Sequence, residues 1–332
     1  MKESKAFHLL WMVTILVTIA GVLMTGLASA GSLEPVAAPS STMKTLDEVE
    51  PRIAIPASST GADTYSISQS GSYYLAGDRV CSRNGILVNA DNVTIDLMEY
   101  SLIGLGTGEY NGIDINARLN VEIRNGTIRN FDTGIQDLNT EINGHRIIDA
   151  RILLNTKSGI DLKGSGNYVK GCTITDNGAN ITLAYGIYSG AKSIVVDNIV
   201  NNNGTNSGGI RAISAGFSSR VAGNLVTKNG YSASSSVLGI IVGDFSTVTG
   251  NTCNENGEGA GGDVYGMYVG GGSTVTGNTS GLNGQNGEGT AYGIYIAFSG
   301  NCLIDQNTAY LNDLNMTTCA SCTMGINHTP AP

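Results

Sequence analysis

The sequence has little of what several functional classes require. Of its 332 residues one is Trp, six are Pro, three are His, and 14% are charged, against about a quarter in a typical soluble domain. The formal net charge is −9, which argues against nucleic acid as a partner, because binding phosphate requires a basic surface. The charge is compatible with bound Ca²⁺, but no cofactor is evident. The three histidines are too scattered for a three-histidine metal site.

Helical periodicity is also missing. No window carries apolar residues at the 3.6-residue period over ten or more positions, so a helical repeat is excluded. Apolar residues instead alternate over four to six positions, as in Ile113-Asp114-Ile115. With 46 Gly and abundant Asn, this composition predicts short strands joined by many turns.

The N-terminus has the features of a secretory signal. Lys2 and Lys5 precede an apolar run, and a small-residue A-x-A site ends at Ala30. We therefore predict a signal peptide over residues 1–30 and a linker or arm over residues 31–60. The mature protein is then expected to be secreted, periplasmic or at the cell surface, with no membrane span after cleavage. The alternative is that the run remains as an anchor.

Six cysteines are present, which in an exported protein allow fifteen disulfide pairings. Cys319 and Cys322 form a C-x-x-C motif, but no second such motif exists. We interpret this pair as a disulfide or as free thiols in a C-terminal tail, residues 319–332. Metal binding or redox chemistry is the less favoured alternative.

A dipeptide of Gly followed by Ile or Met recurs at intervals of 22 to 30 residues. It occurs at Gly85, Gly112, Gly134, Gly159, Gly186, Gly209, Gly239, Gly266 and Gly293. A period in this range is typical of a solenoid. Because the apolar periodicity is that of strands, we predict an all-β, single-stranded parallel β-helix of about nine coils over residues 61–318. The segment Asp63 to Val80 is expected to cap the N-terminal end, which would otherwise be a sheet edge.

Asn occupies one slot of the repeat without a break. The positions are Asn155, Asn177, Asn203, Asn229, Asn256, Asn283 and Asn312. Stacked side-chain amides can both donate to and accept from their neighbours, so this row predicts an Asn ladder that fixes the register of the coils. We also expect these residues to hold the left-handed conformation at a bend.

The phrases "NVTIDL", "NVEIRNGTIRNF" and "VTGN" resemble the right-handed parallel β-helix repeat proteins of the pectin-lyase-like superfamily. The resemblance extends from about Thr64 to Asn312, and right-handed winding is what it implies. Members of that superfamily include polysaccharide lyases, glycoside hydrolases, esterases, tailspike proteins and periplasmic proteins of unknown role. The resemblance therefore specifies the fold and leaves the activity open.

Candidate site residues come from the position two after each repeat Gly, which should point outward. This row reads Leu87, Asp114, Gln136, Asp161, Tyr188, Arg211, Ile241, Tyr268 and Tyr295. Its polar centre, Asp114 to Arg211, with Asn116 and Lys163 further along the same face, suits an oligosaccharide, because carboxylates, amides and Arg bind hydroxyls and Tyr stacks on sugar rings. The alternative is an ordinary solvated sheet face.

Two catalytic schemes are open for this stripe. Asp114 and Asp161 are two coils apart, or about 9.6 Å at the backbone, which permits the carboxylate pair of an inverting glycosidase. A Ca²⁺-dependent lyase could instead use Asp161, Lys163 and Arg211, although the recognisable lyase motifs are absent. His145 is expected to be an inert, exposed turn residue.

The leading hypothesis is a binding or scaffold protein of the cell exterior, with a polysaccharide or cell-surface glycan as its partner. The rival is a polysaccharide lyase or glycoside hydrolase using the same stripe. A third hypothesis is a filament or matrix subunit, which would require self-association through the open ends of the solenoid.

Overall fold

The computed structural model describes Met12 and residues 52–141, 143–297 and 300–330. Residues 52–332 form one compact unit, separate from residues 1–51. The predicted signal peptide and most of the predicted arm therefore lie outside the described residues. Among the residues that are described, no helix is long and apolar enough to cross a membrane.

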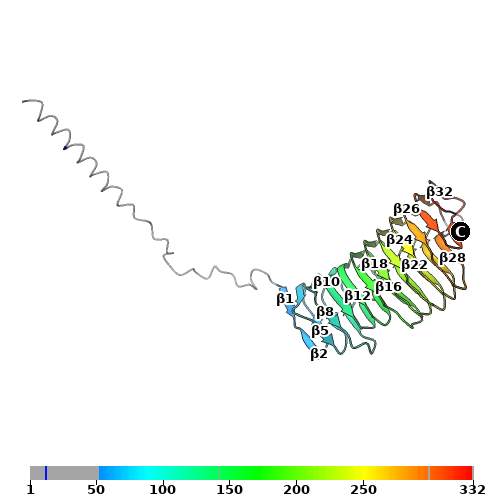
Figure 1. Ribbon diagram of the computed structural model, residues 1–332. Helices are drawn as coiled ribbons and strands as arrows, with labels where there is room; N and C mark the ends of the chain where they lie inside the picture. Colours follow the sequence, from blue (N-terminus) through cyan, green and yellow to red (C-terminus); the bar gives the residue numbers. More distant parts are fainter. Residues whose placement is uncertain (1–11, 13–51, 142, 298–299, 331–332) are drawn as a thin grey trace, which may run out of the picture. The chain divides into compact units, whose positions relative to one another are not determined.

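The unit is a solenoid of short parallel strands, and its coils stack from β1 at one end to β32 at the other (Figure 1). Three strand rows run along it. Two of them, faces 1 and 2, are joined into a 21-stranded sheet by the long strands β10 (Val121–Arg129) and β12 (Arg146–Leu153), which take part in both faces. The third row is a separate 11-stranded sheet.

Face 1 consists of β1 (Arg52–Ile55), β4 (Gly71–Leu75), β7 (Val93–Asp96), the first parts of β10 and β12, β14 (Tyr168–Lys170), β17 (Ile194–Val196), β20 (Arg220–Ala222), β23 (Thr247–Thr249), β26 (Thr274–Thr276), β29 (Leu303–Asp305) and β32 (Thr323–Met324). Face 2 consists of β2 (Ser58–Ala62), β5 (Arg79–Cys81), β8 (Ser101–Ile103), the last parts of β10 and β12, β15 (Thr173–Thr175), β18 (Ile199–Asn201), β21 (Leu225–Thr227), β24 (Thr252–Asn254), β27 (Thr279–Gly281) and β30 (Thr308–Tyr310). The 11-stranded sheet consists of β3 (Tyr65–Ile67), β6 (Ile86–Val88), β9 (Asn111–Asp114), β11 (Thr133–Asp137), β13 (Ser158–Leu162), β16 (Ala184–Ser189), β19 (Ile210–Ala215), β22 (Val237–Val242), β25 (Val264–Val269), β28 (Ala291–Ile296) and β31 (Leu314–Thr317).

The all-β parallel solenoid predicted from the repeat is confirmed. The nine Gly-Ile or Gly-Met dipeptides lie at the nine strands from β6 to β28, and β3 and β31 extend the same sheet at its ends. The segment Asp63 to Val80, expected as a cap, supplies β3 and β4 and pairs in register with the next coil. β1 and most of β2 fall within residues 31–60, where the sequence indicates a linker, and this part belongs to the solenoid because Ile55 is fully buried in the core.

The repeat Gly marks the place where the 11-stranded sheet approaches face 2 most closely. A Cβ on Gly266 would lie 2.1 Å from Ser280 Oγ and 2.6 Å from the carbonyl oxygen of Gly293 in the next coil. A Cβ on Gly239 would lie 2.3 Å from Cys253 Sγ. All three distances are far below van der Waals contact, so a side chain at these positions would separate the two sheets.

The predicted Asn ladder is present at the corner between face 2 and the 11-stranded sheet. From Asn155 to Asn312, the backbone N–H and the Nδ2 of each ladder Asn both donate to the Oδ1 of the next, at 2.8 to 3.2 Å. The remaining amide hydrogen is also used: Nδ2 of Asn203 donates to the carbonyl of Ile174. These side chains are at most 2% exposed, so each amide is satisfied entirely by protein.

The left-handed residue at this corner is not the ladder Asn but the residue before it. Asn202, Lys228 and Glu255 have φ of 54°, 55° and 56°. The expectation that the ladder Asn itself is left-handed is therefore wrong. The chain changes direction at the preceding residue, so that residue adopts the left-handed conformation. The Asn that follows must point inward so that its side chain reaches the next coil.

A second Asn ladder lies at the corner between faces 1 and 2. It consists of Asn198, Asn224, Asn251, Asn278 and Asn307 and ends on Asn327. Its hydrogen bonds, from N–H and Nδ2 to Oδ1, are 2.9 to 3.0 Å long. The third corner carries a Ser row instead, from Ser193 to Ser273, in which a backbone N–H donates to the next Oγ. All three corners are thus held by buried polar side chains.

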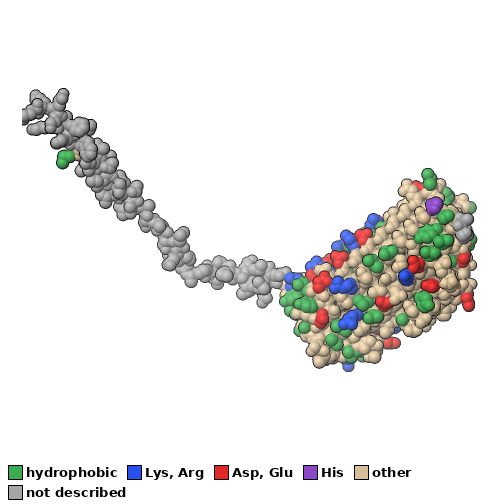
Figure 2. All heavy atoms as spheres, viewed as in Figure 1, with side chains coloured by type: hydrophobic (Ala, Val, Ile, Leu, Met, Phe, Trp, Pro, Cys, Tyr) green, Lys and Arg blue, Asp and Glu red, His purple; other side chains and the backbone are tan. Residues whose placement is uncertain are grey.

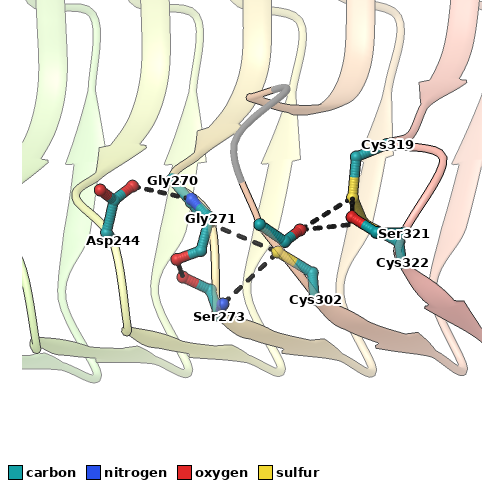
Figure 3. The surroundings of a disulfide bond; sticks show 9 residues. Asp244, Gly270, Gly271, Ser273, Cys302, Cys319, Ser321 and Cys322 are labelled. Atoms are coloured by element: carbon teal, nitrogen blue, oxygen red, sulfur yellow. Dashed lines mark hydrogen bonds between the residues drawn. A yellow bond between two sulfur atoms is a disulfide. The ribbon is translucent and has the colours of Figure 1, made fainter.

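Residues 315–330 lie at the C-terminal end of the solenoid and include a disulfide (Figure 3). Cys319 and Cys322 form a disulfide, which settles the pairing that the sequence left open. Asn327 ends the second ladder, and Asn315, which accepts from Asn312, donates to the carbonyl of Pro330. The predicted tail, residues 319–332, therefore includes residues that complete the ladders.

One core position carries a charge. Asp137, at the end of β11, lies in the inward row that elsewhere contains Leu162 and Val242. Its Oδ2 is 2.8 Å from Nε2 of His145, and its Oδ1 accepts from the backbone of Ala117 and Asn139. Asp137 and His145 are 1% and 0% exposed. The sequence-based expectation of an exposed turn His is therefore wrong, because this His reaches into the core to meet the carboxylate.

The hydrogen bonds assign the proton of this pair. The backbone N–H of Val121 donates to Nδ1 of His145, so the neutral ring carries its proton on Nε2 and donates it to Asp137. Burial alone would raise the pKa of Asp137, but the hydrogen bond from His145 and the backbone amides outweigh burial and lower it below its ordinary value.

Replacing Asn229 by Ala should destabilise the solenoid by on the order of 3 kcal/mol, because the N–H and Nδ2 of Asn203 would lose their acceptor while buried. Urea unfolding followed by circular dichroism measures this change. Asn301→Ala, at an exposed position, is the control and should have an effect within about 0.5 kcal/mol. Equal effects of both substitutions would contradict a stabilising role for the ladder.

The buried Asp137 predicts an acid-sensitive contribution to stability. A carboxyl whose folded pKa is lowered stabilises the protein above its unfolded pKa of about 4 and loses this contribution as the pH falls through the folded value. Asp137→Asn should therefore cost about 2 kcal/mol at pH 7 and should flatten the loss of stability below about pH 4. Urea unfolding at pH 7 and pH 3 tests this, with exposed Glu109→Gln as the control. An unchanged acid slope in Asp137→Asn would exclude this carboxyl as its source.

Candidate functional site

The side of the 11-stranded sheet that faces away from the core carries two rows of side chains. The first outward row consists of Asn111, Thr133, Ser158, Tyr185, Arg211, Leu238, Tyr265, Tyr292 and Leu314. The second outward row consists of Leu87, Asp114, Gln136, Asp161, Tyr188, Ser214, Ile241, Tyr268, Tyr295 and Thr317. The two rows flank the buried repeat dipeptide, so each strand from β9 to β31 contributes one residue to each row.

Side chains of the two rows lean toward one another. The rings of Tyr185 and Tyr188 have centroids 5.2 Å apart in an edge-to-face arrangement, although three residues of extended strand span about 10 Å. The strand bends at Gly186 and Ile187, which are both buried. The repeat that closes the core therefore also brings the two outward rows together.

The structure places four residues of the predicted stripe in one register row and a fifth residue in the other row. Asp114, Gln136, Asp161 and Tyr188 are register neighbours. Arg211 does not follow them: Ser214 pairs with Tyr188, and Arg211 pairs with Tyr185 in the first outward row. The assignment of Arg211 is wrong because Ala212-Ile213, and not Gly209-Ile210, takes the place of the repeat dipeptide in this strand.

The centre of the site is a compact group, which we call the central cluster: Asp161, Lys163, Tyr185, Tyr188 and Arg211. Lys163 Nζ is 3.0 Å from Asp161 Oδ1 and 4.3 Å from the ring centroid of Tyr188. It also lies 5.3 Å from the Tyr185 ring, which the Arg211 guanidinium approaches at 5.9 Å. Two cations and one carboxylate are thus held against a pair of aromatic rings.

The N-terminal part of the stripe is a hydrogen-bonded polar group. Asn111 Nδ2 donates to Gln136 Oε1 at 2.9 Å, and the backbone N–H of Asn116 donates to Asp114 Oδ1 at 3.0 Å. Asn116 lies in the turn after β9, where its Nδ2 donates to Asn89 Oδ1. These contacts orient the amides and the carboxylate, so the group presents a fixed polar surface.

Both carboxyl groups of the stripe are shifted in the same direction. Burial raises the pKa of Asp114, against the hydrogen bonds from Asn116 and Asn111. Burial also raises the pKa of Asp161, and the attraction of Lys163 reduces this rise without cancelling it. Asp161 is 8% exposed. A raised pKa is the property of a general acid, whereas the general base of a carboxyl pair must stay ionised.

The C-terminal part of the same rows is aromatic, and sequence reasoning did not single it out. Tyr265 stacks on Tyr292 at 4.8 Å and Tyr268 stacks on Tyr295 at 5.1 Å. We call these four residues the tyrosine quartet. The signal was present as a motif of Tyr-Gly, then Ile or Met, then Tyr, which occurs in β16, β25 and β28.

The described part of the chain gives less support for metal binding or for a catalytic thiol. No group of three or more His, Cys, Asp or Glu side chains there could hold a metal ion. Cys81, Cys172, Cys253 and Cys302 are free but buried. Burial raises the pKa of Cys172 to about 12, so this thiol is a core residue and not a nucleophile. On the face drawn in Figure 2, Lys and Arg side chains gather toward the N-terminal half of the solenoid.

Comparison with known proteins supports the fold. The family described as the right handed beta helix region matches residues 79–226. No curated protein matches the chain. Among solved structures, the Dettilon tailspike protein (gp208) is similar with a TM-score of 0.41 and 13% identity, over 84% of this chain and 61% of that chain. The chain therefore spans less than two thirds of that protein.

Two modules from Azotobacter vinelandii are similar at the same level. The mannuronan C-5 epimerase AlgE4 A-module has a TM-score of 0.40 and 13% identity, over 78% of this chain and 87% of that chain. The AlgE6 A-module has a TM-score of 0.39 and 13% identity, over 85% and 91%. The stacked parallel sheets show that the chain is a parallel β-helix, and residues 79–226 of it match the family described as the right handed beta helix region.

Proposed function

We propose that the chain is an exported carbohydrate-binding protein whose ligand lies on the outward rows of the 11-stranded sheet. The observation that carries the proposal is the central cluster, in which Lys163 and Asp161 are held against the rings of Tyr185 and Tyr188. Sugars present apolar C–H faces and a rim of hydroxyls. Half-exposed aromatic rings next to oriented charges match both features.

The polar residues next to the central cluster also match the hydroxyl groups of a sugar. Gln136 and Asp114 lie one and two coils away from Asp161 in the same row, and both are already oriented by Asn neighbours. Pre-oriented polar groups lose little conformational freedom when they bind a ligand. A solvated sheet face without function has no reason to gather a buried carboxylate, two cations and two aromatic rings at one place.

A second candidate function rests on the shifted carboxyls. Asp114 and Asp161 both have raised pKa values and stand two strand steps apart, about 9.6 Å at the backbone. Inverting glycoside hydrolases separate their carboxyls by about 6.5–9.5 Å. This geometry favours hydrolysis over a Ca²⁺-dependent lyase reaction, because the described residues include no cluster of acidic metal ligands.

Removal of the aromatic pair tests the binding function. The double substitution Tyr185→Ala and Tyr188→Ala should reduce affinity for the retained polysaccharide about tenfold, or ~1.4 kcal/mol, because it removes the stacking surface. Affinity electrophoresis against polygalacturonate, alginate, xylan and mixed-linkage β-glucan measures the effect. Tyr231→Ala, on an exposed loop, is the control and should leave retention unchanged. Absence of retention on all four polymers would overturn the proposal.

Substitution of Asp161 separates binding from catalysis. For a binding protein, Asp161→Asn should weaken affinity severalfold through loss of the Lys163 ion pair, and no new reducing ends should form with any of the four polymers. Reducing ends released by the wild type and abolished in Asp161→Asn would instead establish the hydrolase. Unsaturated uronides that appear only with Ca²⁺ would establish a lyase.

A further inference from the structure

The residue just before each strand of face 1 belongs to a row along the corner between the 11-stranded sheet and face 1. Before β17, β20, β23 and β26 this residue is Ser193, Ser219, Ser246 or Ser273, and each backbone N–H donates to the next Oγ. Before β29 the row continues with a sulfur, because the N–H of Ser273 donates to Sγ of Cys302 at 3.4 Å. Cysteine therefore replaces serine where the row meets the C-terminal disulfide (Figure 3).

Cys322 occupies the next place in this row. β29 pairs in parallel with β32, and the N–H of Thr323 donates to the carbonyl of Cys302 at 2.8 Å. The two sulfurs also have equivalent surroundings. Cys302 Sγ donates to the carbonyl of Gly270 in the coil before it, and Cys322 Sγ lies 3.8 Å from the carbonyl oxygen of Gly300 in the coil before it. The two cysteines are thus stacked one strand spacing apart, or about 4.8 Å.

That spacing is suitable for a disulfide, because the Cα atoms of bonded cysteines are usually about 4.4–6.8 Å apart. Stacked side chains of paired parallel strands point the same way, so a change of χ1 rotamer at one cysteine brings the two sulfurs together. In the structure Cys322 is bonded to Cys319 instead, and Cys319 Sγ lies 2.9 Å from the same Gly300 carbonyl oxygen. One corner therefore holds three sulfurs, as one disulfide and the free thiol of Cys302.

We propose that these three cysteines form a thiol–disulfide exchange site, in which the disulfide moves from Cys319–Cys322 to Cys302–Cys322. The Cys302 thiolate attacks Cys322 Sγ, so that the Cys302–Cys322 bond forms while the Cys319–Cys322 bond breaks. The electron pair leaves on Cys319, which takes up the proton that Cys302 lost. No oxidant or reductant is consumed. Because the step is internal, it does not require solvent to reach Cys302, which is 1% exposed.

The two pairings constrain different parts of the molecule. Cys319–Cys322 closes a short turn within the last coil, whereas a Cys302–Cys322 bond connects that coil to the one before it. The last coil contains Asn315 and Asn327, which end the two Asn ladders. The position of the disulfide therefore decides how firmly the C-terminal end is held to the solenoid. None of the three cysteines belongs to the outward rows, so the proposal does not depend on carbohydrate binding.

Peptide mapping of the full chain tests the exchange. Cleavage before each Asp places Cys302 on residues 263–304 and the other two cysteines on residues 313–332. After incubation with reduced and oxidised glutathione at about pH 8, alkylation in acid traps the pairings. The wild type should give these two peptides both separately and linked to each other, whereas Cys302→Ser should give them only separately. Cys253→Ser, which removes another buried free thiol, is the control and should give the same mixture as the wild type.

The variant Cys319→Ser isolates the second pairing. Its Cys322 has lost the local partner, so oxidised glutathione should link Cys302 to Cys322 in the folded protein. Circular dichroism confirms that each variant is folded, and Cys302→Ser restores the residue that the four preceding coils use in this row.

Three results would overturn the proposal. The first is a Cys319→Ser protein in which Cys302 is alkylated and Cys322 carries glutathione. The second is a wild type that gives only separate peptides at every ratio of reduced to oxidised glutathione. The third is a linked pair of peptides in Cys322→Ser, because Cys319 and not Cys322 would then be the partner of Cys302.

Discussion

The buried amide ladders are the interaction on which the rest of the structure depends. Asn229 Oδ1, for example, accepts two hydrogen bonds from the coil before it, and the backbone N–H and Nδ2 of Asn229 donate to the coil after it. A slip of one residue would leave several buried polar groups without partners at every corner. The ladders therefore fix the register of each coil against the next. The same register aligns the residues of the outward rows. The alignment of Asp161 with Tyr188 is a consequence of this register.

The repeat Gly adds a second constraint that links core and surface. Its missing side chain lets the 11-stranded sheet approach face 2, and the bend that this requires turns the flanking residues toward each other on the outer side. Packing in the core thus brings side chains of the two outward rows together on the outer side of the 11-stranded sheet. The same dipeptide recurs in nearly every coil, so the two positions beside it recur at about 4.8 Å per coil, although the residue type at each position changes.

Much of this architecture is readable from the sequence, and the exceptions have physical causes. The strands at Gly-Ile, and the ladder from Asn155 to Asn312, follow from regular spacing. Arg211 was misplaced because Ala212 can replace the repeat Gly, which a search for Gly does not detect. The Asp137–His145 pair could not be predicted because the inward row of Asp137 holds apolar or small residues in the following coils, and a lone His carries no sequence signal for the carboxylate that it meets. The hydrogen bonds of the second ladder, from Asn198 to Asn307, depend on the geometry of the corner between faces 1 and 2.

The polar and aromatic halves of the outward rows therefore carry different information. Positions that hold the same residue in successive coils, such as the ladder Asn, indicate what the fold requires, because every coil needs the same contact. Positions that change from coil to coil report what the scaffold displays: Asp114 and Asp161 in the N-terminal half, and the tyrosine quartet in the C-terminal half. The rings are only partly covered by protein, although their stacking contributes to stability in its own right. Partly covered aromatic rings thus continue the two rows that begin with polar and charged residues, so one face of the sheet displays both kinds of side chain.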